Sequence, residues 1–167
     1  MGRGPSAGGC AVSSGLVVSR DMSVLAPNFA SAVRNAVSEC NRNGLDAFVY
    51  EAYRSHELQS LYYARGRTVI PPSTPVTNAA SNLYSWHGYG LAVDVISRGR
   101  EWSVPDAWYA AVADIFRQFG CKWGGSWTKP DLPHFQWGPC RPSPSDYARE
   151  PMAAEGPEGV WRAVGAV

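Results

Sequence analysis

The segment SWHGYGLAVDVIS, residues 85–97, joins a glycine-rich turn to an apolar run that contains a single acid. The run after the glycines is apolar enough for a buried strand, which places Asp94 inside a sheet and His87 at the entry to that strand. Taken singly, His87 could be a satisfied turn histidine and Asp94 a buried acid that caps a neighbouring loop. A carboxylate in an apolar strand is costly to bury unless it is paired or binds a metal, and that cost favours a ligand role for Asp94.

The rest of the chain shows helices and strands that intermix without regular alternation. Apolar residues at helical spacing, with capping and stop residues, predict three helices: between Asn28 and Gly44, from Ser55 to Gly66, and from Pro105 to Phe119. Alternating or β-branched runs predict the strands: 46–54, 89–97, 121–125 and 134–137. Residues 67–84 carry three prolines and are expected to form a long irregular loop. We therefore predict an α+β fold, with a small antiparallel sheet flanked by about three helices.

The bulk composition excludes several classes of protein. With 167 residues, 45% of them hydrophobic, the chain is long enough for one compact domain. Its formal net charge of +1 gives no field that would favour nucleic acid or an anionic membrane. No apolar stretch approaches the roughly 20 residues of a membrane span, and the first part of the chain lacks the apolar region of a secretory signal. We expect a protein without membrane insertion and without its own export signal.

The two ends of the chain differ from its middle. We predict a Gly- and Ser-rich N-terminal arm over residues 1–27, one compact domain over residues 28–140, and a Pro-rich C-terminal tail over residues 141–167. The composition of the tail predicts poor packing and a wrapped or mobile segment that docks by Trp161.

The four cysteines show no metal-binding or redox spacing. Two disulfides or free thiols are both compatible with the four positions, Cys10, Cys40, Cys121 and Cys140. The absence of an export signal favours free, partly buried thiols.

Only three histidines are present, and two of them lie near acids. A catalytic zinc site needs three protein ligands and leaves a further position for water. His87, Asp94 and His134 supply such a set if the strand around Asp94 lies beside the strand HFQW, residues 134–137. His56 is interpreted as a surface residue.

These residues also carry a family resemblance. Ser85-x-His87-x-x-Gly90-x-Ala92-x-Asp94, followed by Asp131-x-x-His134, resembles the zinc peptidases of the M15 family, the D-alanyl-D-alanine carboxypeptidases and endopeptidases also called LAS or VanY-like peptidases. The stretches YRSHELQSLYYARGRT (53–68), WGGSW (123–127) and DLPHFQW (131–137) are similar to the phage endolysin branch, which cleaves L-alanyl-D-glutamate bonds in peptidoglycan. The resemblance covers about residues 28–138 and implies the fold of the hedgehog and D-Ala-D-Ala peptidases.

The resemblance implies a role for each of the matching residues. His87, Asp94 and His134 would hold one Zn²⁺ per chain, and Gly88 and Gly90 would let the backbone turn tightly between the first two ligands. Asp131 would be the general base, and Arg54 would stabilise the developing oxyanion. Residues expected around the substrate or behind the ligands are Gln59, Ser85, Trp86 and Tyr89.

The resemblance also implies a setting: a monomer that acts on the peptidoglycan stem peptide. Such a protein would be made in the host bacterial cytoplasm and would reach the cell wall at lysis. One alternative is a D,D-carboxypeptidase that trims terminal D-alanine. In that branch a glutamate followed by Trp-His is usual, whereas this chain has Asp131 and Pro133-His134. The other alternative is a non-catalytic zinc-containing module that only binds cell wall; the presence of Asp131 and Arg54 argues against it.

Overall fold

A computed structural model describes residues 17–167, so the first part of the predicted arm, and Cys10 with it, lies outside the described residues. The chain folds around one four-stranded sheet with strand order β1-β2-β4-β3, in which every neighbouring pair is antiparallel. The strands are β1 (Ala47–Glu51), β2 (Ala92–Ser97), β3 (Cys121–Trp123) and β4 (His134–Trp137). The predicted α+β class and antiparallel sheet are confirmed.

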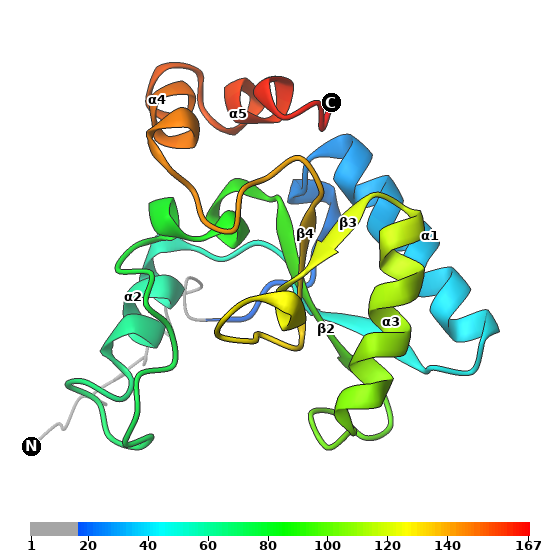
Figure 1. Ribbon diagram of the computed structural model, residues 1–167. Coiled ribbons are helices and arrows are strands. Elements are labelled where there is room, and N and C mark those ends of the chain that lie inside the picture. The colour runs from blue at the N-terminus through cyan, green and yellow to red at the C-terminus, as the bar shows by residue number, and fades with distance from the viewer. Residues whose placement is uncertain (1–16) are drawn as a thin grey trace, which may run out of the picture.

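Two helices cover one face of this sheet, α1 (Pro27–Arg42) and α3 (Asp106–Gln118), which lie side by side in Figure 1. Each presents an apolar stripe at helical spacing, for example Phe29 and Val33 in α1 and Val112 and Phe116 in α3, and all four residues are buried. The side chains of a strand point alternately to opposite faces. Val93, Val95 and Phe135 therefore join this core, which leaves Asp94 and His134 on the other face.

The other face of the sheet is bordered by α2 (His56–Ala64) and the segment that follows it. Ser55 caps α2 by accepting a hydrogen bond from the backbone N–H of Leu58, as the sequence predicted. The region predicted as an irregular loop contains only the short 3-10 helix η3 (Asn82–Tyr84), and a second one, η4 (Trp86–Tyr89), leads into β2. This irregular segment forms one border of the site.

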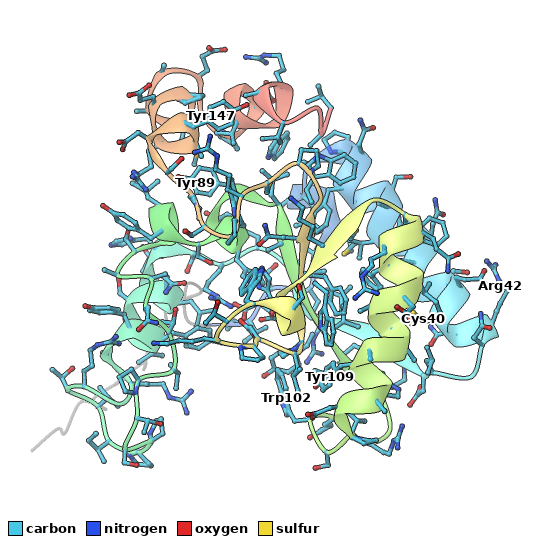
Figure 2. All side chains as sticks on the ribbon, viewed as in Figure 1. Cys40, Arg42, Tyr89, Trp102, Tyr109 and Tyr147 are labelled. Carbon is cyan, nitrogen blue, oxygen red and sulfur yellow. The ribbon has the colours of Figure 1, made fainter. Side chains whose placement is uncertain are left out.

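The C-terminal segment differs from its prediction. It forms two further helices, α4 (Asp146–Glu155) and α5 (Pro157–Ala163), which lie across one end of the molecule in Figure 1. Trp161 docks as predicted: its indole N–H donates to the carbonyl of Tyr89 at 2.7 Å. Figure 2 shows Tyr89 below α4. Several residues of the segment belong to the main core: Ala148, Val160, Val164 and Ala166. The expectation of poor packing is therefore wrong.

The cysteines of the described part of the chain are free and buried, in agreement with the favoured prediction: Cys40, Cys121 and Cys140. Burial raises the pKa of each of these thiols to about 12, so they stay protonated at neutral pH. Among residues 17–167, no helix combines the length and apolar character needed to cross a bilayer.

Candidate metal centre

The register of the sheet brings three polar residues into one row. Asp94 on β2 lies directly opposite His134 on β4. On the other side of β2, Val49 pairs with Val95, but the next pair is Glu51 with Asp94, so the register shifts by a residue. Such a bulge re-aims a side chain. Here it puts Glu51, rather than Tyr50, opposite Asp94 on the side of the sheet away from the helices.

The remaining candidate ligand, His87, comes from η4 at the entry to β2. Two glycines position it. Gly90 takes the left-handed conformation, with φ of 66°, that ends η4. A Cβ atom on Gly88 would lie 2.3 Å from the carbonyl oxygen of Asn82, so only glycine allows η4 to pack this closely against η3. The predicted tight turn is confirmed, and Gly88 contributes to it through close packing.

His87, Asp94 and His134 converge as the sequence predicted, and their donor atoms all lie within 4.8 Å of one another. Asp94 Oδ1 is 3.4 Å from His87 Nε2 and 3.7 Å from His134 Nδ1. His87 is buried, and its Nε2 has no hydrogen-bond partner in the described part of the chain. An orphaned buried nitrogen is costly, and a metal ion bound between the three donors would satisfy it. The three residues therefore fit a metal site.

Neighbouring groups fix which nitrogen of each histidine is available. His87 Nδ1 lies 2.9 Å from the carbonyl oxygen of Ala52, which can only accept, so Nδ1 carries the proton and Nε2 has the free lone pair. His134 Nε2 lies 3.1 Å from Oε1 of Gln136, whose own amide nitrogen donates to the carbonyl of Arg141. The proton of His134 is therefore on Nε2, and Nδ1 faces Asp94. Both free lone pairs point into the candidate centre.

The charge of Asp94 is strongly stabilised. Its side chain is only 13% exposed, and burial opposes ionisation. His87, His134 and Arg54 outweigh that penalty, so the pKa of Asp94 lies well below its usual value. The carboxylate is therefore ionised, as a metal ligand must be.

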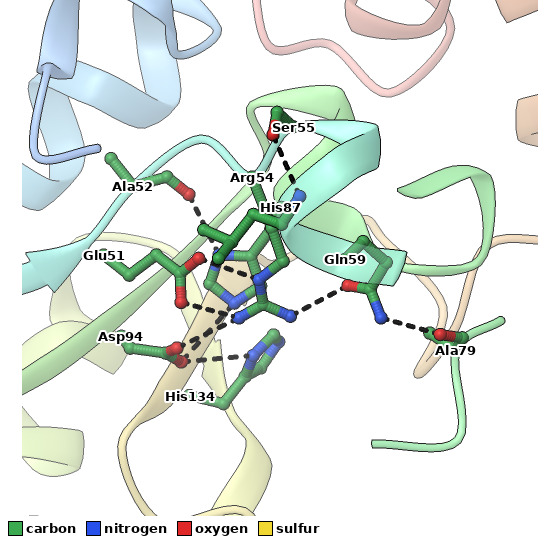
Figure 3. A network of polar contacts seen from close by, with 10 residues as sticks. Glu51, Ala52, Arg54, Ser55, Gln59, Ala79, His87, Asp94 and His134 are labelled. Atoms are coloured by element: carbon green, nitrogen blue, oxygen red, sulfur yellow. Dashed lines mark hydrogen bonds and ion pairs between the residues drawn. The ribbon is translucent and has the colours of Figure 1, made fainter. Parts of the chain in front are cut away.

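Arg54 is held at the start of α2 by a network that Figure 3 shows in close view. Its Nε and Nη2 donate to the two carboxylate oxygens of Glu51 at 2.8 and 2.9 Å, and Nη2 also lies 3.4 Å from Asp94 Oδ2. Nη1 donates to Gln59 at 3.1 Å, and Gln59 in turn donates to the carbonyl of Ala79. This bidentate pairing fixes the guanidinium beside the candidate ligands.

Asp131 reaches the site through a turn that packs against Gly124. The backbone N–H of Asp131 donates to the carbonyl of Gly124 at 3.1 Å, and a Cβ atom on Gly124 would lie 2.7 Å from the Asp131 carbonyl oxygen. Much of Asp131 faces solvent, yet packing around its carboxyl and repulsion from Asp94 raise its pKa. The attraction of His134, His87 and Arg54 offsets this only in part.

The candidate ligands lie in a cleft of about 510 Å³ that Arg54 and Asp131 also line. Trp127 packs against His134 with ring centroids 5.0 Å apart, and Tyr62 lies beneath the guanidinium of Arg54 at 4.9 Å. A cleft with a buried polar floor and aromatic walls suits an extended peptide.

Of the remaining predicted residues, some line the cleft and others lie away from it. Ser85 and Trp86 line the cleft; Ser85 hydrogen-bonds through its backbone, and the Trp86 indole donates to the carbonyl of Arg141. Gln59 lies behind Arg54. Tyr89 is buried away from the cleft lining and donates to the carbonyl of Leu83. His56 is exposed on α2, as predicted.

Two residues of the site were not found from the sequence. Glu51 is 2% exposed and Gln136 is 1% exposed, and both hold functional side chains rather than lining the core. A glutamate and a glutamine inside strand patterns were the available signal, because buried polar groups need partners.

The comparisons with known proteins agree with this geometry. Residues 78–137, which include the three candidate ligands and Asp131, match the sequence profile of an M15 peptidase family described as D-alanyl-D-alanine carboxypeptidase. The chain is thus similar to M15 peptidases over this segment. The matched segment supplies η4, β2 and β4, the elements that carry His87, Asp94 and His134.

The chain is also similar to individual proteins. The peptidoglycan L-alanyl-D-glutamate endopeptidase CwlK of Bacillus subtilis (strain 168) is 26% identical over 136 residues, which cover 73% of this chain and 77% of CwlK. The crystal structure of the L-Ala D-Glu endopeptidase ChiX of Serratia marcescens superposes with a TM-score of 0.54 at 24% identity, covering 72% of this chain and 88% of ChiX. This superposition supports the fold. VanY, a D,D-pentapeptidase of a VanB-type resistance cassette, superposes more loosely, with a TM-score of 0.46 at 16% identity over 77% of each chain.

Proposed function

We propose that this chain is an M15 peptidase and acts as a zinc-dependent peptidoglycan hydrolase that cleaves the bond between L-alanine and D-glutamate in the stem peptide. The observation that carries the proposal is the convergence of His87, Asp94 and His134 in the cleft, with a buried His87 Nε2 that lacks a partner. The choice of bond is supported by the similarity to CwlK, whose name states that activity.

The donor set favours zinc. Two imidazole nitrogens and one carboxylate oxygen form a common protein ligand set for a catalytic Zn²⁺ with an open position. All three residues come from one chain, so we propose one zinc ion per monomer. The chemistry that zinc supplies at such a site is polarisation of the scissile carbonyl and activation of a water molecule.

The chain's own residues would move the protons and stabilise charge. Asp131 would accept a proton on its carboxylate from the attacking water and later donate it to the leaving amine of D-glutamate. Its raised pKa suits an exchange in both directions. Arg54 would stabilise the charge that develops on the carbonyl oxygen, because its guanidinium is fixed by Glu51 and faces the cleft.

The setting is proposed on the resemblance alone. A monomer of this kind would act on the stem peptide during phage-driven lysis, after synthesis in the host cytoplasm. A second candidate is D,D-carboxypeptidase activity on D-Ala-D-Ala termini, which the description of the matched family profile favours.

Mass spectrometry of products from defined muropeptides separates these functions. Zinc-loaded protein is expected to release a peptide that begins with D-glutamate, and neither a chelated sample nor Asp131→Ala should release it. Loss of a terminal D-alanine would move the protein to the carboxypeptidase reaction. Bound zinc without any cleavage would contradict hydrolysis altogether.

A further inference from the structure

Arg65 is a cation in the cleft that the proposed reaction does not use. It lies at the C-terminal end of α2, is exposed, and lines the same cleft as the candidate ligands. Arg54, the other arginine of the cleft, is engaged by Glu51, Gln59 and Asp94. Within residues 17–167, no hydrogen bond, ion pair or ring contact is made by the Arg65 guanidinium. We propose that Arg65 binds a carboxylate of the substrate and so sets the specificity of the cleft, an inference that rests on the proposed function.

The position of Arg65 follows from one face of α2. Leu58 is buried, Tyr62 is half-buried, and Arg65 is exposed, so this face rises from the core to the opening of the cleft. Residues three or four apart on a helix are neighbours, with Cβ atoms about 5–6 Å apart. Arg65 therefore follows Tyr62 along the cleft wall.

A chain of contacts connects Arg65 to the candidate metal centre. The ring of Tyr62 lies 4.9 Å from the Arg54 guanidinium carbon, and Arg54 Nη2 lies 3.4 Å from Asp94 Oδ2. An extended peptide advances about 3.3–3.6 Å per residue. Arg65 is thus within reach of a carboxylate on about the first two or three substrate residues beyond the scissile bond.

The backbone at Arg65 is fixed, although its side chain is free. Its N–H donates to the carbonyl of Leu61 at 3.1 Å, and a bridge pairs it with Val69. Gly66, with φ of 79°, packs so closely that a Cβ atom would lie 2.0 Å from the Thr74 carbonyl oxygen. Arg67 on the same turn is used structurally, because it donates to Tyr63 and Thr77 carbonyls. A free guanidinium on a fixed backbone is suited to ligand recognition.

The proposed substrate offers a carboxylate at this distance. In the stem peptide, D-glutamate continues the chain through its γ-carboxyl, so its α-carboxylate remains free beside the scissile bond. A carboxylate on the following residue has the same chemistry. An arginine fork can hold either group by paired charge-assisted hydrogen bonds.

The test uses three synthetic peptides with the sequence L-Ala-γ-D-Glu-L-Lys. The first keeps only the D-glutamate α-carboxylate, the second only the C-terminal carboxylate, and the third has both groups as amides. The zinc-loaded wild type is expected to cleave one of the first two with a kcat/KM about tenfold above the third, mainly through a lower KM. Whichever peptide is preferred identifies the carboxylate that Arg65 binds.

Variants assign that preference to the guanidinium. Arg65→Gln should cleave all three peptides at the rate of the third, and Arg65→Lys should keep part of the preference. Arg34→Gln, which changes an exposed arginine on α1, should behave as the wild type. A wild type without preference, an Arg65→Gln that keeps the preference, or an Arg65→Gln that slows all three peptides equally would overturn the proposal.

A binding measurement keeps this test separate from catalysis. Cleavage of none of the peptides by the wild type would refute the proposed function. The role of Arg65 is then still decided by calorimetric titration of the wild type and of Arg65→Gln. The ligands are the product γ-D-Glu-L-Lys amide, its α-amide, and the peptide that has a free C-terminus. Carboxylate-dependent binding that Arg65→Gln removes supports it, and equal binding by both proteins refutes it.

Discussion

Glu51→Gln is expected to destabilise the protein far more than the same change in a chemically matched pair on the surface. Glu51 and Arg54 form a bidentate pair three residues apart, with side chains that are 2% and 10% exposed. Glu39 and Arg42 have the same spacing on α1, where Nε and Nη2 of Arg42 both donate to Oε2 of Glu39, but their side chains are 33% and 65% exposed. The two pairs therefore differ mainly in burial.

The expected loss in the free energy of unfolding depends on the contacts that Arg54 retains in Glu51→Gln. Removing one partner of a buried ion pair costs about 3–5 kcal/mol, because the other charge remains buried without compensation. Arg54 would retain Gln59 at 3.1 Å and Asp94 at 3.4 Å, so we expect the lower end, about 3 kcal/mol. For a chain of this size that loss lowers Tm by about 6–12 °C. Glu39→Gln should cost much less, because solvent screens an exposed ion pair.

Urea unfolding followed by circular dichroism, with a chelator present so that metal binding does not contribute, measures both losses. Equal losses of stability for Glu51→Gln and Glu39→Gln would refute the reasoning. Such a result would mean that the Arg54 network is no stronger than a surface ion pair.

Three further predictions concern the candidate centre. Asp131→Asn should abolish cleavage yet raise the Tm of the apo-protein at pH 7 in thermal unfolding, because the raised pKa of Asp131 means that folding disfavours its carboxylate. This gain in Tm should shrink as the pH falls towards about 4, and a gain that stays constant with pH would contradict the prediction. Gly124→Ala should displace the Asp131 turn and lower kcat by up to about 100-fold in a peptide-cleavage assay, with an unchanged kcat as the contrary result. Gln136→Leu should weaken zinc binding by about 10–100-fold in a competition titration with a chelating dye, because His134 loses the acceptor that orients it; wild-type affinity would exclude that role.

The candidate ligands could be predicted because their residue types and their positions within the predicted strands already indicate a metal site. Asp94 is an acid inside an apolar strand, and His134 begins a short strand, so a single assumption about strand pairing brought them together. The structure confirms that pairing. His87 follows from the glycine turn before the strand, where glycine permits the left-handed conformation that Gly90 adopts.

Other features depend on contacts that no local pattern reveals. Glu51 reaches Asp94 only because a bulge shifts the register, and strand alternation cannot show where a bulge lies. The helices after Pro139 bury small residues such as Ala148 and Gly159, and α4 contains Pro151, so neither helix shows a strong apolar stripe. Their order comes from tertiary packing against the core, which composition does not report.

A zinc titration of chelated protein, followed by cleavage of the stem peptide, tests the central claim most directly. We expect cleavage to rise linearly and to stop rising at one equivalent of zinc per chain, in the wild type and in His56→Gln, which changes an exposed histidine outside the centre. His134→Gln should neither bind that equivalent nor cleave. Full cleavage without zinc, or a His134→Gln titration that matches the wild type, would contradict the assignment of His87, Asp94 and His134 as the zinc site.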